Sequence, residues 1–147
     1  MKVKRSERMQ VVLNLAEQAE QEAGRHLANA QSQCQQAEQQ LQQLVDYNQS
    51  YIAEIQSKTV ALTASGMVSD REFLRRLGGA QEEQQQRLRQ MNEIRTNLQT
   101  VWRKKYQYRK AIAELIDRLE KAESRSLEQA LQRQLDEMAT QQYIRNR

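Results

Sequence analysis

Apolar residues recur along the first third of the chain in alternating steps of four and three, the spacing that places them on one face of a helix. Starting from Met9, twelve of fourteen such positions are apolar, and no proline interrupts them. About seven sustained heptads predict a helix over residues 5–62 with a coiled-coil seam, the line of side chains that faces a partner helix. This first seam consists of Met9, Leu13, Ala16, Glu20, Ala23, Leu27, Ala30, Cys34, Ala37, Leu41, Leu44, Asn48, Tyr51 and Ile55.

The pattern stops over residues 63–70, where small and polar residues surround a glycine. Such a cluster marks a turn, so we predict a bend there. Ser69 is followed three residues later by Glu72, which fits a capping box. The second helix is therefore expected to restart at Asp70 and to run over residues 71–125.

A second seam begins at Phe73, where twelve of fifteen positions are apolar. Two seams joined by a short connection predict an all-α fold, a long antiparallel two-helix coiled coil or helical hairpin. In this arrangement Met9 faces about residue 123. The second seam consists of Phe73, Leu77, Ala80, Gln84, Arg87, Met91, Ile94, Leu98, Val101, Lys105, Tyr108, Ile112, Leu115, Leu119 and Ala122. The coiled-coil core is expected at Leu13, Leu27, Leu41, Met91, Ile94, Leu98, Ile112, Leu115 and Leu119.

The last segment, residues 126–147, is predicted to be an overhanging C-terminal helical tail. Its apolar residues form a stripe in a new phase, and the hairpin leaves them no intramolecular partner. Two interpretations stay open: a frayed end, or an amphipathic helix that binds a partner protein. The stripe consists of Leu127, Leu131, Leu135 and Met138.

Composition favours this single helical domain over a globular or sheet-containing fold. The 147 residues include 25 Gln and only 38% apolar residues, too few large apolar side chains for a compact sphere of this length. Strand-forming residues are thinly spread, whereas Gln, Glu, Arg, Ala and Leu are good helix formers. The net charge of +4 is a mild bias, smaller than that of a dedicated nucleic-acid arm.

Residues suited to catalysis or metal binding are scarce. One Cys, Cys34, and one His, His26, cannot form a disulfide or a zinc site. The sequence has no phosphate-binding glycine loop and no catalytic triad. No stretch approaches the ~18 apolar residues of a membrane span, and the apolar run after the basic N-terminus is too short for a signal peptide. We therefore predict a cytoplasmic protein that is not an enzyme and takes no metal, cofactor or small-molecule ligand.

The segment 102–110 contains five cations and Trp102, whose indole is expected to be exposed. Interleaved Tyr106 and Tyr108 are compatible with nucleic-acid binding. The charges fall all round the helix, however, which favours a solvated face or an acidic protein partner. A basic nucleic-acid-binding coiled coil stays an alternative, although no nucleic-acid partner is our expectation.

Two matching stripes flank the predicted bend, one on each helix. Most of these residues coincide with seam positions, so coiled-coil core is one interpretation. Val45, Tyr47 and Ile52 add apolar bulk on both sides of the seam, which is typical of an exposed interface. From the residues alone the two interpretations stay equally open. The stripes consist of Gln40, Leu44, Tyr47 and Tyr51, and of Phe73, Leu77, Ala80 and Gln84.

The segment from Cys34 to Leu41, running on through Leu44-Val45-Asp46-Tyr47-Asn48 to Tyr51, resembles the FliJ family of flagellar export proteins. The later Trp102-Arg103-Lys104-Lys105, the chain length and the lone Cys resemble that family as well. The resemblance implies a component of the bacterial flagellar type III export apparatus, built as an antiparallel coiled coil like the central stalk of rotary ATPases. It implies a non-enzymatic stalk that couples the ring of the export ATPase FliI to the membrane export gate protein FlhA and escorts export chaperones.

The same resemblance implies where the partners bind. Family members dock on the gate near the bend, which corresponds here to Gln40, Leu44, Tyr47, Tyr51, Phe73, Leu77, Ala80 and Gln84. Gln84 departs from the family pattern, which can carry His at this position. The end with both termini would enter the ATPase ring, and the protein would associate peripherally with the inner-membrane export apparatus. The equivalent stalk protein of a virulence-type injectisome is the alternative within this class.

Overall fold

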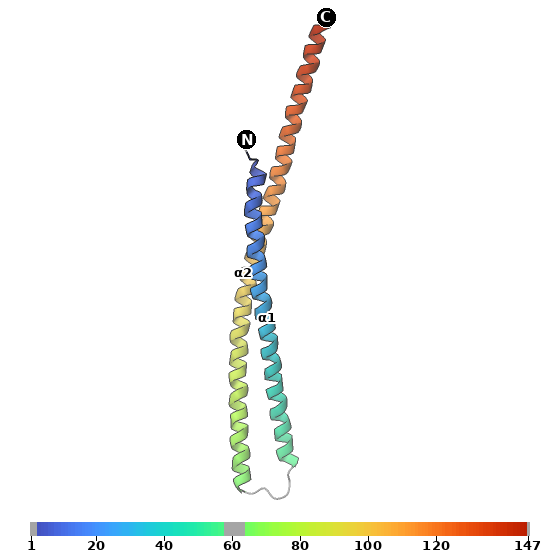
Figure 1. The fold of residues 1–147 in the computed structure, drawn as a ribbon. Helices are drawn as coiled ribbons and strands as arrows, with labels where there is room; N and C mark the ends of the chain where they lie inside the picture. The colour runs from blue at the N-terminus through green and yellow to red at the C-terminus, as the bar shows by residue number, and fades with distance from the viewer. Residues whose placement is uncertain (1–2, 58–63, 147) are drawn as a thin grey trace. The chain divides into compact units, whose positions relative to one another are not determined.

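Two long helices make up the computed structural model, which describes residues 3–57 and 64–146. Helix α1 spans Arg5–Ser57 and helix α2 spans Ala64–Arg145 (Figure 1). Within the described residues the chain forms no strand. Residues that favour helices dominate both segments and no proline breaks them. The two helices pack against each other, so the predicted all-α coiled-coil hairpin is confirmed.

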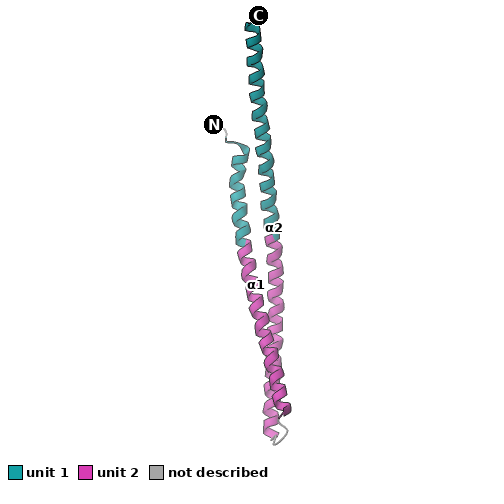
Figure 2. Ribbon diagram, turned by 90° about the vertical axis from the view of Figure 1, so that its right-hand side faces the viewer, with its two compact units in different colours: residues 1–22, 103–147 teal, residues 23–102 magenta. Residues whose placement is uncertain are grey.

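The chain divides into two compact units, each built from a stretch of both helices (Figure 2). One unit comprises residues 1–22 and 103–147, and the other comprises residues 23–102. In the first unit Ser6 of α1 bonds to Glu123 of α2, and Glu20 of α1 bonds to Arg109 of α2. In the second unit contacts between the helices run from Gly24 against Trp102 to Tyr51 against Phe73, and the pairs of residue numbers converge along the chain. Within each unit the helices are therefore antiparallel.

Helix α2 begins earlier in the chain than the sequence pattern predicts. Helix α2 starts at Ala64, so residues 64–70 are helical and the predicted restart at Asp70 is wrong. The rest of the predicted bend, residue 63, and the predicted helical residues 58–62 lie outside the described residues. Gly66 lies within these helical residues. A glycine in a helix costs only about 1 kcal/mol, which packing of α2 against α1 can offset. As a result Ser6, and not Met9, lies opposite Glu123.

All fourteen positions of the first seam are buried or half-buried. The most buried are small, with Ala16, Cys34 and Ala37 each only 3% exposed. Ala23 and Ala30 are buried as well. Small side chains on α1 leave room opposite them for long side chains on α2.

The side chains of α2 that face α1 also recur in steps of four and three, but in the opposite order from the predicted second seam. Ile94, Val101 and Tyr108, predicted to face α1, are 55%, 44% and 53% exposed. The core assignment of Ile94 is therefore wrong. Ala80, also placed on the predicted seam, is exposed as well. The residues that follow the first three along the chain face α1 instead. They are Arg95, Trp102 and Arg109, all half-buried.

Long side chains on α2 explain this shift of register. Trp102, expected to be exposed, packs over Gly24: a Cβ built on this glycine would lie 3.5 Å from the indole Nε1. In the other unit the Arg109 Nε donates to Oε2 of Glu20 at 2.6 Å. The Arg109 guanidinium also lies 5.2 Å from the ring centroid of Tyr106. A count of apolar positions favours the residues before these as the seam. Only the longer side chains, however, span the gap above the small residues of α1.

The remaining predicted core residues are half-buried and include no fully enclosed side chain. Ile116, next to one of them, is the most buried large residue of α2 at 5% exposed. This is the burial expected of two helices without a third layer. The half-buried residues are Leu13, Leu27, Leu41, Met91, Leu98, Ile112, Leu115 and Leu119.

Helix α2 continues beyond the first turn of α1 as one uninterrupted helix. Every residue from 124 to 146 is exposed, including the predicted apolar stripe. We refer to residues 124–146 as the overhang. No helix in the described part of the chain is long and apolar enough to cross a membrane.

Candidate protein-binding surface

An open groove crosses both helices in the unit formed by residues 23–102. Its volume is about 580 Å³. Two glutamines, Leu44 and Tyr47 line it from α1, and Leu77 and Gln84 line it from α2. An open, mixed apolar and amide surface of this kind suits a protein segment better than an enclosed small molecule. The lining residues are Gln40, Gln43, Leu44, Tyr47, Leu77 and Gln84.

Three aromatic rings brace one end of this groove. The ring centroid of Phe73 on α2 lies 4.6 Å from that of Tyr51 and 6.2 Å from that of Tyr47, both on α1. The Tyr47–Phe73 pair is edge-to-face, with an angle of 72° between the rings, a geometry that aromatic quadrupoles favour. Tyr47 remains 54% exposed. It is thus an aromatic side chain held in place on one edge and open to a partner on the other.

A hydrogen bond fixes Tyr51 behind the exposed ring. The Tyr51 hydroxyl donates to Oδ1 of Asp70 at 2.7 Å. This bond to a carboxylate favours the neutral phenol and raises the pKa of Tyr51 to about 12. Because Asp70 lies in the first turns of α2, the bond ties the start of that helix to α1.

Amide groups fix the other side of the groove. The Nε2 of Gln84 donates to the Ala37 carbonyl oxygen at 3.3 Å and to Oε1 of Gln40 at 3.2 Å. Nearby, the Nδ2 of Asn48 donates to Oε1 of Gln81 at 3.4 Å. These bonds cross between the helices and pin their register at the groove.

The structure brings together most of the eight residues predicted for gate binding. Gln40, Leu44, Tyr47, Leu77 and Gln84 line the groove. The ring of Phe73 contacts the rings of Tyr47 and Tyr51. Ala80 is exposed but does not line it.

Sequence reasoning missed two residues of this surface. Gln43 lines the groove, and its place one helical turn before Tyr47 could have revealed it. The sequence pattern predicts Asp70 only as a helix start, and no sequence signal points to its bond with Tyr51.

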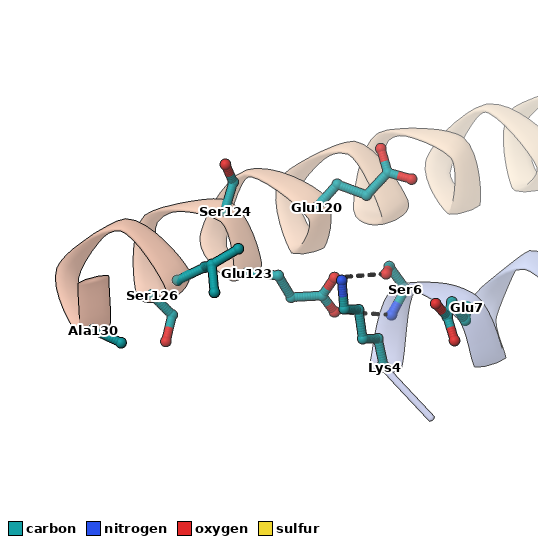
Figure 3. A pocket seen from close by; sticks show the side chains of 9 residues that line it. Lys4, Ser6, Glu7, Glu120, Glu123, Ser124, Ser126 and Ala130 are labelled. Atoms are coloured by element: carbon teal, nitrogen blue, oxygen red, sulfur yellow. Dashed lines mark hydrogen bonds between the residues drawn. The ribbon is translucent and has the colours of Figure 1, made fainter. Parts of the chain in front are cut away.

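A second cavity, of about 740 Å³, lies in the other unit, where α1 begins (Figure 3). There the Glu123 carboxylate reaches from α2 to the first turn of α1. It accepts hydrogen bonds from the Ser6 hydroxyl at 2.7 Å and the Ser6 backbone N–H at 3.1 Å. The first N–H groups of a helix lack intrahelical acceptors, so Glu123 acts as a cap supplied by the other helix. These bonds lower the pKa of the Glu123 carboxyl.

Neither cavity carries a set of side chains suited to catalysis. Among residues 3–57 and 64–146, no group of three or more His, Cys, Asp or Glu side chains could hold a metal ion. Cys34 is a buried free thiol on the first seam. The arrangement defines a class: a two-helix coiled-coil protein with an open groove beside an exposed aromatic side chain.

Comparisons with known proteins specify this class further. The sequence model of the family described as Flagellar FliJ protein matches residues 5–147. The Flagellar FliJ protein of Escherichia coli (strain K12) is 29% identical over 133 residues, which cover 90% of each chain. No solved structure matches the chain significantly.

The chain belongs to the FliJ family. It is a component of the flagellar protein export apparatus, and it is not an enzyme, because the family is non-catalytic.

Proposed function

We propose that this protein couples the export ATPase to the membrane export gate and escorts emptied export chaperones. In this proposal FliI and FlhA are its principal partners. The protein works from the cytoplasm, at the periphery of the inner-membrane export apparatus. The flagellar match favours this role over that of an injectisome stalk.

The groove on residues 40–84 is the proposed binding site for the gate. The observation that carries it is the aromatic cluster around Tyr47, whose ring is exposed yet held edge-to-face by Phe73. A ring already fixed before binding loses little conformational entropy when a partner covers it. Aromatic anchors of this kind commonly dominate interface energetics.

The overhang is the proposed binding site for the ATPase ring. All of its described residues are exposed and it carries an apolar stripe. A single helix with an unpaired apolar face gains stability when a partner covers that face. A continuous helix transmits force and position along its axis, which is what a coupling element between two partners requires.

The test is a binding titration of purified full-length protein against the soluble domain of the gate protein. Tyr47→Ala should weaken binding at least tenfold, because the side chain is exposed and removing it costs the fold little. Tyr108→Ala is the matched control, since Tyr108 is 53% exposed against 54% for Tyr47. Unchanged gate affinity in Tyr47→Ala, with melting curves intact, would remove the gate assignment.

The proposed ATPase contact is tested separately. Deleting residues 127–147 removes most of the overhang, whose described residues make no buried contact. The thermal transition of the shortened protein should stay close to that of the full chain, whereas binding to the ATPase should weaken. Equal ATPase affinity would show that the overhang is not the contact.

A further inference from the structure

A pair of amide side chains interrupts the apolar seam in the unit formed by residues 23–102. Asn48 on α1 and Gln81 on α2 are both half-buried, and the Asn48 Nδ2 donates to Oε1 of Gln81 at 3.4 Å. The Oδ1 of Asn48 is buried and has no hydrogen-bond partner among the described residues. A buried acceptor without a partner lowers stability, so two leucines would stabilise this layer more. We call Asn48 and Gln81 the amide layer.

The seam beyond the amide layer repeats every seven residues. Ala23, Ala30 and Ala37 on α1 are all buried and are spaced by seven. If α2 moved along α1 by seven residues, about 10 Å, its side chains would meet the same small residues again. The indole of Trp102 over Gly24 favours the observed alignment at one end of the unit. At the other end, next to the groove, the amide layer breaks the repeat.

The neighbours of Gln81 along α2 show how the amide layer discriminates between alignments. The residues seven positions before and after it are Leu74 and Leu88, both half-buried. A shift of one heptad in either direction would place one of these leucines opposite Asn48. The Asn48 amide would then lose its hydrogen bond in a half-buried site, which costs free energy. A single Asn in a seam sets the alignment of coiled-coil helices in this way, at a cost in stability.

We propose that Asn48 and Gln81 fix which residues of α1 and α2 lie opposite each other near the groove. They act as positioning residues, because the groove is lined from both helices and its shape exists in one alignment. A shift of about 10 Å would also part Tyr47 from Phe73. The alignment is a property of this chain alone, whereas its consequence for gate binding rests on the proposed function.

A double substitution in the full-length protein tests the proposal. Asn48→Leu with Gln81→Leu makes this layer as apolar as the positions of Leu74 and Leu88, so the observed and shifted alignments become similar in stability. The melting temperature should rise by about 2–4 °C, because no amide is left in the layer. The single variant Gln81→Leu should melt at a lower temperature than the unmodified protein, because Asn48 then faces a leucine in all three alignments.

Spin labels report the alignment directly. The labelled protein carries Gln36→Cys on α1 and Gln99→Cys on α2, both at exposed positions, and Cys34→Ala ensures that no other thiol is labelled. Pulsed electron paramagnetic resonance should find one distance between the labels when the amide layer is intact. The double variant should show a second distance, because a heptad shift moves one label along the other helix by about 10 Å. Leu41→Met, a volume-conserving change one heptad before Asn48, is the matched control and should keep the single distance.

Two results would refute the proposal. A single label distance in the double variant would show that other contacts set the alignment. A lower melting temperature of the double variant would make the amide layer an ordinary stabilising contact. Where two distances appear, gate affinity should fall in proportion to the shifted fraction. Two distances with unchanged gate affinity would uphold the role of the amide layer and would contradict the gate site on the groove.

Discussion

Replacing Gly24 with Ala should stabilise this protein. Gly24 lies in the middle of α1, where a glycine costs about 1 kcal/mol relative to alanine. An added Cβ would lie 3.5 Å from Nε1 and 3.6 Å from Cδ1 of Trp102, which is ordinary van der Waals contact. The methyl group therefore fits against the indole without displacing it. We expect Gly24→Ala to raise the free energy of unfolding by about 1 kcal/mol.

Two further substitutions separate helix propensity from packing. A Cβ added at Gly79 meets nothing within 4 Å, so Gly79→Ala should give a similar gain from helix propensity alone. Gly24→Leu should instead lower stability by about 1–3 kcal/mol, because its larger side chain has to displace the indole. Thermal and urea unfolding measure these changes, and about 1 kcal/mol corresponds to a shift of roughly 2–4 °C in melting temperature.

The fluorescence of the single tryptophan reports on the packing directly. Its emission should be unchanged in Gly24→Ala and should shift to longer wavelength in Gly24→Leu as the indole becomes solvated. The reasoning fails if Gly24→Ala destabilises the protein while Gly79→Ala stabilises it. That result would mean that the indole packs too closely on α1 to admit a methyl group.

The remaining predictions concern three polar contacts between the helices. Hydrogen bonds lower the pKa of Glu123 below its ordinary 4.5. Their stabilisation is therefore present at neutral pH and is lost as the pH falls through the lowered value. Glu123→Gln should lower the melting temperature at pH ~7 and should lower it much less at pH ~3. Asp70→Asn should lower the pKa of Tyr51 from about 12 toward its ordinary 10, as followed by ultraviolet titration of tyrosinate. Glu20→Ala should cost about 1–3 kcal/mol in urea unfolding, because Arg109 loses a charged hydrogen bond in a half-buried site.

Each of these predictions has an internal comparison. The ion pair of Asp117 with Lys121 is 61% and 69% exposed, so Asp117→Ala should cost no more than about 0.5 kcal/mol. If it costs as much as Glu20→Ala, burial is not what gives the Glu20 pair its strength. A pH-independent loss in Glu123→Gln would likewise contradict the capping role of that carboxylate. An unchanged tyrosinate titration in Asp70→Asn would show that the hydrogen bond is not the source of the raised pKa.

Much of the candidate surface could be predicted from the sequence, because it lies on helices whose periodicity is known. Residues spaced four and three apart share a helix face, so spacing alone is enough to place Leu44 and Tyr47 on one side of α1. The contact between the rings of Phe73 and Tyr51 depends on how the two helices align across the hairpin. Periodicity within one helix contains no information on that alignment.

The sequence by itself determined the fold class and the seam of α1. Long runs of helix-forming residues without proline leave the backbone few alternatives, and the small residues of α1 lie on one face at every heptad. Only the tertiary structure decided the seam of α2 and the residue at which α2 begins. On α2 two neighbouring lines of residues compete, one through Ile94 and Val101 and one through Arg95 and Trp102. The more apolar line stays exposed because the small side chains of α1 leave a gap that only the long side chains of the other line can fill.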